Sequence, residues 1–195
     1  MRRDAQVRTP FVIVVQHDRN FMRQVDVRPI VSAMCRHRAW LKYAGLPTGT
    51  TIKHAQQCLS RYALRLEHVP TDEGLKLMPL IQWYDSTHVC STAHYRQFVY
   101  GAQGGGNLVK KGGFVEDKLG QKQLSDVRAG GMSAHAPYGT FIVEDGSEEI
   151  ATSHLDGHDR MNFKKFRWAR PSVQASAEIG RSPGRETTKD SEAPA

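Results

Sequence analysis

The pattern of apolar and polar positions predicts one strand near the start of the chain, followed by helices. Phe11–Val15 is a short, mostly β-branched apolar run bounded by Pro10 and by polar residues, which is typical of a buried strand. Pro29 suits a first helical turn, and apolar residues follow near helical spacing up to Gly45. We therefore expect a helix over about Arg28–Ala44.

A second helix has the clearest amphipathic pattern in the chain. From Ile52 to Glu67 apolar residues recur every three or four positions, with Thr51 placed to cap the first turn. Together with the helix before it, this segment predicts a helical hairpin. Leu75–Tyr84 and Ser91–Tyr100 are expected to add shorter helices, the former starting near Pro79. Residues 1–100 are thus predicted to form a mainly helical N-terminal region.

The chain changes character at Gly101, after which glycines cluster and oppose helix. Gly113–Glu116 and Tyr138–Glu144 read as strands, and Asp145-Gly146 is a hairpin signal. We expect a small antiparallel β-unit over residues 101–170. Residues 171–195 hold almost no core residues, so we expect an extended polar tail. The predicted fold class is α+β.

Composition and charge narrow the possible partners. The formal net charge is +7, which favours nucleic acid, anionic lipid or an acidic protein surface. Residues 1–44 carry nine Arg or Lys against three Asp. The charges are dispersed, so a solvated surface of mixed charge remains the alternative. No apolar run approaches the roughly 20 residues of a membrane span. Three cysteines without a CxxC pair favour a reducing compartment over a disulfide framework.

Catalytic and metal signatures are weak. His88, Cys90 and His94 lie close in sequence, as do the histidines and aspartates of His154–Asp159, but neither cluster offers a closed set of metal ligands. The glycine-rich stretch lacks the Gly-Lys-Ser/Thr sequence of a phosphate loop. Adjacent carboxylates such as Glu116-Asp117 are typical of solvated turns. We therefore expect a non-enzyme with no metal and no cofactor.

The strongest candidate interface alternates aromatic and basic residues near the C-terminal end. Such a pattern can stack bases and neutralise phosphates, while an edge strand with one packed face is the alternative. Its residues are Phe163, Lys164, Lys165, Phe166, Arg167 and Trp168.

Three segments resemble one family. Gly113–Lys122 is similar to the glycine–hydrophobic–acidic–Lys–x–Gly–Asn–Lys signature of accessory subunit twelve of the alpha subcomplex of mitochondrial complex I, the NADH:ubiquinone oxidoreductase. Thr140–Ser147 resembles that family's strand ending in Asp-Gly-Ser, and Lys165–Trp168 its Lys-Phe-x-Trp. Gln123-Leu124 stands where the family has paired tyrosines, and its Pro-Pro-Glu-Trp-His segment has no counterpart.

The resemblance implies a non-catalytic structural subunit of the respiratory chain. Such a subunit braces neighbouring protein subunits on the matrix side of the inner mitochondrial membrane, peripheral to that membrane, and holds no flavin, iron–sulfur cluster or quinone. The alternative is a mitochondrial ribosomal protein whose basic residues contact rRNA. A third class is an enzyme that uses the His154–Asp159 cluster.

Overall fold

A computed structural model describes residues 7–101, 108, 113–147 and 149–154. Within residues 7–101 it contains β1 (Phe11–Val14), β2 (Arg19–Phe21), α1 (Arg28–Arg36), β3 (Tyr43–Gly45), α2 (His54–Tyr62), β4 (Val69–Pro70), β5 (Lys76–Pro79), β6 (His88–Ser91), α3 (Thr92–His94) and the π-helical turn η1 (Tyr95–Val99). Later in the chain come α5 (Val115–Gly130), the 3₁₀ turn η2 (Gly131–His135), β7 (Thr140–Glu144) and β8 (Thr152–His154).

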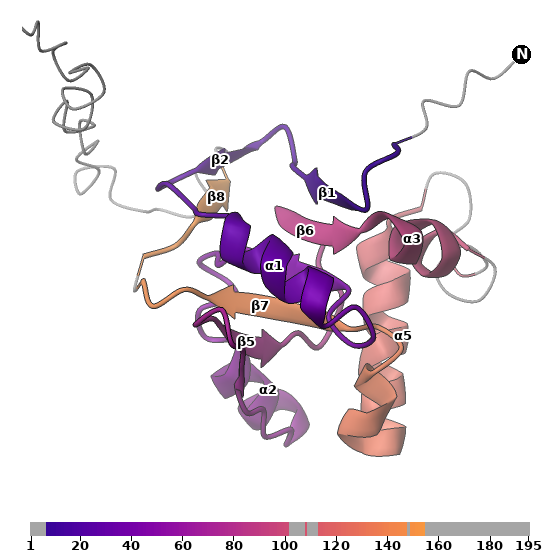
Figure 1. The fold of residues 1–195 in the computed structure, drawn as a ribbon. Helices are drawn as coiled ribbons and strands as arrows, with labels where there is room; N and C mark the ends of the chain where they lie inside the picture. The colour runs from indigo at the N-terminus through magenta and orange to yellow at the C-terminus, as the bar shows by residue number, and fades with distance from the viewer. Residues whose placement is uncertain (1–6, 102–107, 109–112, 148, 155–195) are drawn as a thin grey trace, which may run out of the picture. The chain divides into compact units, whose positions relative to one another are not determined.

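Six of these strands form one mixed sheet in the order β1-β6-β3-β7-β5-β4. All neighbours are antiparallel except β3 and β7, which run parallel with Tyr43 opposite Thr140. β2 and β8 form a separate two-stranded antiparallel ribbon. Segments distant in sequence therefore lie side by side at the centre of the sheet (Figure 1).

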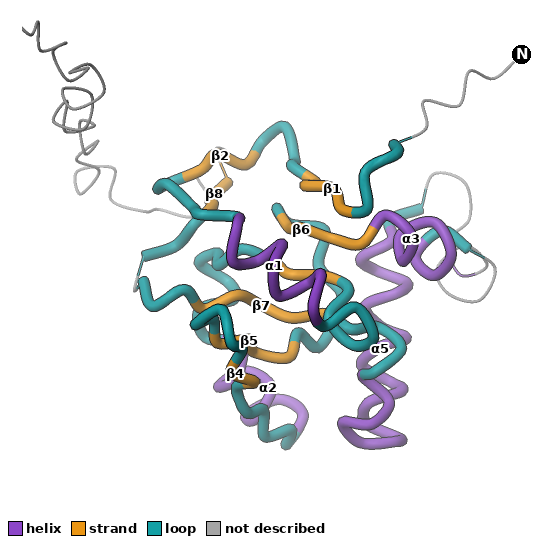
Figure 2. Tube along the Cα trace, viewed as in Figure 1, coloured by secondary structure: helices purple, strands orange, loops and turns teal. Residues whose placement is uncertain are grey.

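Helices cover both faces of this sheet (Figures 1 and 2). On one face, Ile30, Ala33 and Met34 of α1 pack with strand residues that include Val89 and Phe141. On the other face, α2 and α5 pack against the opposite side chains of the same strands. Because alternate residues of a strand point to opposite faces, each central strand contributes to both layers of core.

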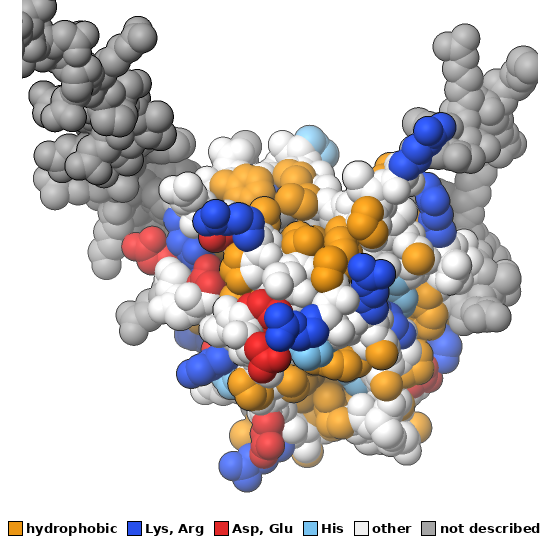
Figure 3. All heavy atoms as spheres, viewed as in Figure 1, with side chains coloured by type: hydrophobic (Ala, Val, Ile, Leu, Met, Phe, Trp, Pro, Cys, Tyr) orange, Lys and Arg blue, Asp and Glu red, His pale blue; other side chains and the backbone are white. Residues whose placement is uncertain are grey.

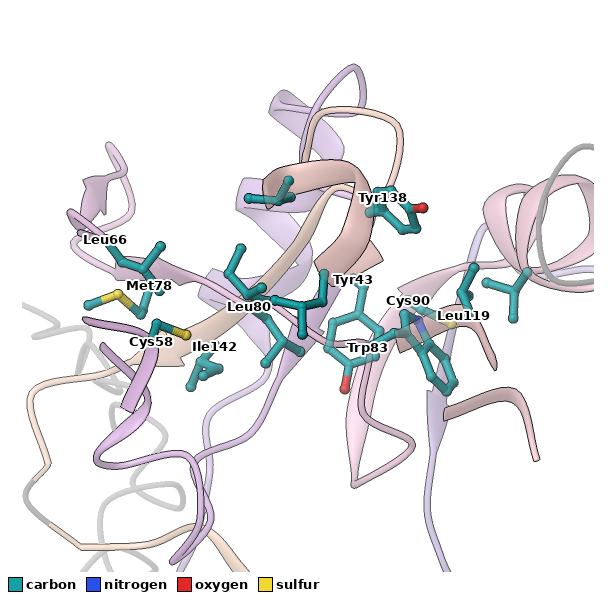
Figure 4. Close-up of a cluster of buried hydrophobic side chains, with 14 residues drawn as sticks. Tyr43, Cys58, Leu66, Met78, Leu80, Trp83, Cys90, Leu119, Tyr138 and Ile142 are labelled. Carbon is teal, nitrogen blue, oxygen red and sulfur yellow. The ribbon is translucent and has the colours of Figure 1, made fainter. Parts of the chain in front are cut away.

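The core between the sheet, α2 and α5 is rich in aromatic rings. Figure 4 shows Tyr43 and Trp83 beside each other, with ring centroids 5.8 Å apart. Gly120 of α5 lies over this region, and a Cβ there would come within 3.1 Å of the Trp83 carbonyl oxygen. A glycine at this point of α5 lets the helix approach the Trp83 backbone closely.

A buried polar network fixes α5 and η2 to the sheet. The Gln123 amide donates to the Leu80 carbonyl at 2.7 Å and to Thr140 Oγ1 at 2.8 Å. His135 Nε2 donates to the Thr140 carbonyl at 2.8 Å. Such contacts satisfy backbone groups where β7 begins, which defines the position of that strand.

Several sequence predictions are confirmed. β1 lies at the predicted first strand, β7 lies within the predicted Tyr138–Glu144 strand, and α3 with η1 occupies the predicted Ser91–Tyr100 helix. The α+β class is confirmed in its coarse form, a mixed sheet covered by helices. The extended tail over residues 171–195 lies outside the described residues.

Other predictions are corrected. The region up to residue 100 is not mainly helical, because six strands lie there, and β3 replaces the end of the predicted first helix. The predicted helix starting near Pro79 is absent: β5 ends at Pro79 and residues 80–84 are not helical. The predicted strand at Gly113–Glu116 overlaps the start of α5. Residues 101–170 do not form a separate antiparallel unit, since β7 pairs with β3 and β5. Asp145-Gly146 does not close a hairpin, because β8 pairs with β2.

A candidate anion-binding groove

A groove of about 740 Å³ lies beside the start of β1, between α1 and the α3–η1 segment. Three arginines line it and come from three separate parts of the chain: Arg8 from the segment before β1, Arg38 from the turn after α1, and Arg96 from η1. All three are exposed. Apolar side chains of Phe11, Met34 and Leu41 also line the groove.

Hydrogen bonds hold the segment before β1 against α3. Thr92 Oγ1 donates to the Thr9 carbonyl at 2.7 Å, and the Thr92 amide donates to the Pro10 carbonyl at 3.0 Å. Arg96 adds a bond from Nη2 to the Val7 carbonyl at 2.6 Å. These bonds place Arg8 and Arg96 on the same groove although 87 residues separate them in sequence.

Among the described residues, no carboxylate neutralises the charge of the groove. The described residues that line it include no Asp or Glu. Arg23, Arg28 and Arg36 each pair with a carboxylate. Within the part of the chain that the structure describes, Arg8, Arg38 and Arg96 have no such ion pair. A guanidinium presents several donors in a planar fork that matches phosphate and carboxylate, so this groove suits an anionic group.

The residues of the His88–His94 cluster, by contrast, belong to the core. The His88 ring stacks on Tyr43 with centroids 4.2 Å apart and is fully buried. Its Nδ1 donates to the Ser86 carbonyl, which fixes the tautomer, so Nε2 accepts from the Tyr95 hydroxyl at 2.7 Å. His94 stacks on Phe98 instead, with centroids 4.8 Å apart. His88 therefore serves as a packing and hydrogen-bonding group, and His94 and the fully buried Cys90 serve as packing groups.

Burial keeps these groups in their neutral forms at pH 7. It lowers the pKa of both His88 and His94 to about 4 and raises the pKa of the Cys90 thiol to about 12. His54 follows the same rule, because burial lowers its pKa to about 4 while Nε2 accepts from the Ile81 amide at 3.0 Å. A neutral buried thiol is a poor nucleophile, and a neutral His bonded on both nitrogens is held in place.

One pair of carboxyl groups is brought together that the sequence did not indicate. Glu116 Oε2 accepts from the Asp85 backbone amide at 3.3 Å, and both side chains are half-buried. Burial raises the pKa of each carboxyl, although Arg19 partly opposes this at Asp85 and the Asp85 backbone amide partly opposes it at Glu116. The Asp85 carboxylate also accepts from Gln16 Nε2, and Gln16 Oε1 in turn accepts from Arg19 Nε at 2.6 Å. The group joins the start of α5 to the β1–β2 turn.

The predicted interface Phe163, Lys164, Lys165, Phe166, Arg167 and Trp168 lies outside the described residues. So does most of the His154–Asp159 cluster; its first member, His154, lies in β8 with Nδ1 3.4 Å from the Asp18 carboxylate. Among the residues that are described, no three His, Cys, Asp or Glu side chains are grouped to hold a metal ion. None of the described helices has both the length and the apolar composition needed to cross a membrane.

Sequence reasoning did not identify the groove. The only signal was the excess of basic residues near the start of the chain, which does not reveal that Arg8 and Arg38 meet Arg96. Comparison with known proteins gave no match to any family model, curated protein or solved structure.

Proposed function

We propose that this chain is a non-catalytic subunit of a larger assembly and that it binds an anionic partner in the groove of Arg8, Arg38 and Arg96. The observation that carries this proposal is the convergence of these three arginines on one groove whose described lining residues include no carboxylate. Isolated guanidinium groups beside apolar walls recognise phosphate or carboxylate while the walls exclude water.

The chemistry of the histidines and thiols supports a non-catalytic role. A catalytic histidine needs a pKa near the working pH, and a catalytic cysteine needs a lowered one. Burial has the opposite effect here, lowering the pKa of His88 to about 4 and raising that of the Cys58 thiol to about 11. These side chains serve the core, and the exposed arginines provide the binding surface.

The assembly we propose is respiratory complex I, on its matrix arm. This proposal rests on the resemblance of Gly113–Lys122, Thr140–Ser147 and Lys165–Trp168 to its accessory subunit twelve. In that setting the groove would hold acidic side chains of a neighbouring subunit, on the matrix side of the inner mitochondrial membrane. The chain would brace its neighbours without a cofactor of its own.

A second candidate is a mitochondrial ribosomal protein that contacts rRNA, and the groove is the observation that favours it. Arginines close to Phe11 combine phosphate contacts with an aromatic side chain, which is how proteins bind single-stranded RNA. The two candidates differ in ligand: carboxylates on a protein for complex I, and phosphodiesters for the ribosome.

The test is anisotropy of the purified full chain with two fluorescent probes, a single-stranded RNA oligonucleotide and an acidic polyglutamate peptide. The groove variant is Arg8→Glu with Arg38→Glu. The matched control is Arg61→Glu with Arg65→Glu, which makes the same charge change at two exposed positions in and after α2, on the other face of the sheet.

We expect the groove variant to weaken binding of the preferred probe about tenfold or more, and the control to change it much less. For RNA, each lost phosphate contact should also reduce the slope of log affinity against log salt by about 0.7. Equal effects of the two variants would show that only net charge matters and would refute the groove. Co-migration of the tagged chain with complex I or with ribosomes on native gels then decides between the two assemblies.

A further inference from the structure

The outer edge of β1 carries backbone groups that no described residue pairs. β1 is the last strand of the sheet and contacts β6 on one side only. The Thr92 amide donates to the Pro10 carbonyl at 3.0 Å, so the polar groups of Pro10 face β6. Because these groups alternate along an antiparallel strand, those of Val12 and Val14 also face β6, and those of Phe11, Ile13 and Val15 point outward.

The usual protections of a sheet edge are missing from this segment. Edges are normally shielded by charged side chains, by proline or by a bulge. Residues 11–15 hold no charge, and the missing N–H of Pro10 lies on the β6 side, where it does not interrupt the outer edge. Ile13 and Val15 remain 49% and 50% exposed, with Phe21 of β2 at 47%. Figure 3 shows hydrophobic side chains gathered over the region of β1 and β2.

We propose that β1 pairs antiparallel with β1 of a second copy of this chain, around a two-fold axis at Ile13. In this register Ile13 lies opposite Ile13 of the second copy, and Phe11 lies opposite Val15. Every outward N–H and C=O of these residues then meets an outward group of the other copy, as an antiparallel ladder requires. The pairing joins two six-stranded sheets into one of twelve strands.

Charge favours a second copy over a less specific strand partner. The register brings Arg8, before β1, towards the turn after β1 of the other copy, which holds Asp18. The Asp18 side chain is 41% exposed, and Arg8 is exposed as well. Two-fold symmetry repeats the contact, so the same segment supplies both the basic and the acidic end. The strand edge carries this pairing, which shares Arg8 and Phe11 with the lining of the groove.

The first test is sedimentation velocity of the purified full chain over a range of concentrations. We expect a monomer–dimer equilibrium for the native sequence. Ile13→Lys places two ammonium groups opposite each other at the axis and should leave a monomer throughout. Ile52→Lys is the control, because Ile52 is 53% exposed and lies outside β1, and it should dimerise like the native chain. A native chain that stays monomeric at every concentration would overturn the proposal.

The second test needs no variant and so does not depend on how Ile13→Lys folds. Amide hydrogen exchange read by NMR should show Phe11, Ile13 and Val15 protected more strongly as the concentration rises. Val12 and Val14 should be protected equally at every concentration, because their amides bond β6 within one copy. Protection of the first three amides that is independent of concentration would point to another segment of the same chain on this edge. That result, or equal exposure of these amides throughout, rejects the second copy.

Discussion

Acid is expected to unfold this protein because four described histidines, His135 among them, are buried in their neutral forms. His54, His88 and His94 are 4%, 0% and 9% exposed, and burial lowers the pKa of each from 6.5 to about 4. The unfolded chain therefore binds these protons more readily than the folded chain does. Their contribution to stability is complete above about pH 6.5 and is lost as the pH falls towards 4.

The size of the effect follows from the two pKa values. Between pH 7 and pH 5, each histidine with a folded pKa of about 4 is expected to remove about 2 kcal/mol from the free energy of unfolding. Three such groups together remove roughly 6 kcal/mol, a large share of the roughly 5–15 kcal/mol typical of a whole domain. The raised carboxyl pKa values of Asp85 and Glu116 act in the opposite direction at acid pH and offset part of this loss.

The assay is urea denaturation followed by circular dichroism at about pH 7 and pH 5. The variant His54→Asn removes one titrating group and should reduce the pH-dependent loss by about 2 kcal/mol, whatever it does to stability at pH 7. Equal unfolding free energies at the two pH values for the native chain would refute the reasoning.

Two further predictions concern the backbone and the thiols. Gly139 has φ +58°, and a Cβ there would lie 2.5 Å from the Trp40 carbonyl oxygen, whereas Gly131 has φ +68° with no atom within 4 Å. In urea denaturation we expect Gly131→Ala to lower the free energy of unfolding by about 1 kcal/mol, because of backbone strain alone. Gly139→Ala should lower it by at least about 2 kcal/mol more, because the new Cβ also meets the Trp40 carbonyl oxygen. Equal losses for the two variants would contradict this steric clash. With a thiol reagent at pH 7, exposed Cys35 should react in the folded protein, while Cys58 and Cys90, whose thiol pKa values burial raises to about 11 and 12, should react only after unfolding. If all three thiols of the folded protein reacted rapidly, Cys58 and Cys90 would have to be accessible to solvent, which would contradict their burial.

The sequence predicted elements whose signals are local. β1 is an apolar run bounded by proline and polar residues, and α1 begins where Pro29 marks a first helical turn. The apolar spacing after Pro29 predicted a helix that continues to about Ala44, but α1 ends at Arg36. Tyr43–Gly45 is buried on both faces of the sheet, so β3 shows no alternation of polar and apolar residues that would reveal a strand.

At α5, packing against the sheet outweighs the low helix preference of the glycines. Glycines at 112, 113 and 120 argued against a helix, yet Val115–Gly130 is helical. Gly120 is explained by the close approach of α5 to Trp83, a contact between residues 37 positions apart. The groove escaped prediction for a similar reason, because its arginines become neighbours only after β1, α1 and η1 have been assembled.

The parallel pairing of β3 with β7 has a consequence for how the chain folds during synthesis. β7 lies between β3 and β5, so it connects β1, β6 and β3 with β5 and β4. A nascent chain that ends before Thr140 has strands for both parts of the sheet but lacks the strand that joins them. Contacts between residues so far apart in sequence form slowly, and until they form the backbone edges of β3 and β5 that pair with β7 lack their partner. The sheet can therefore close only after translation has passed Glu144, the last residue of β7, and the chain made before then has strand edges without their native neighbour.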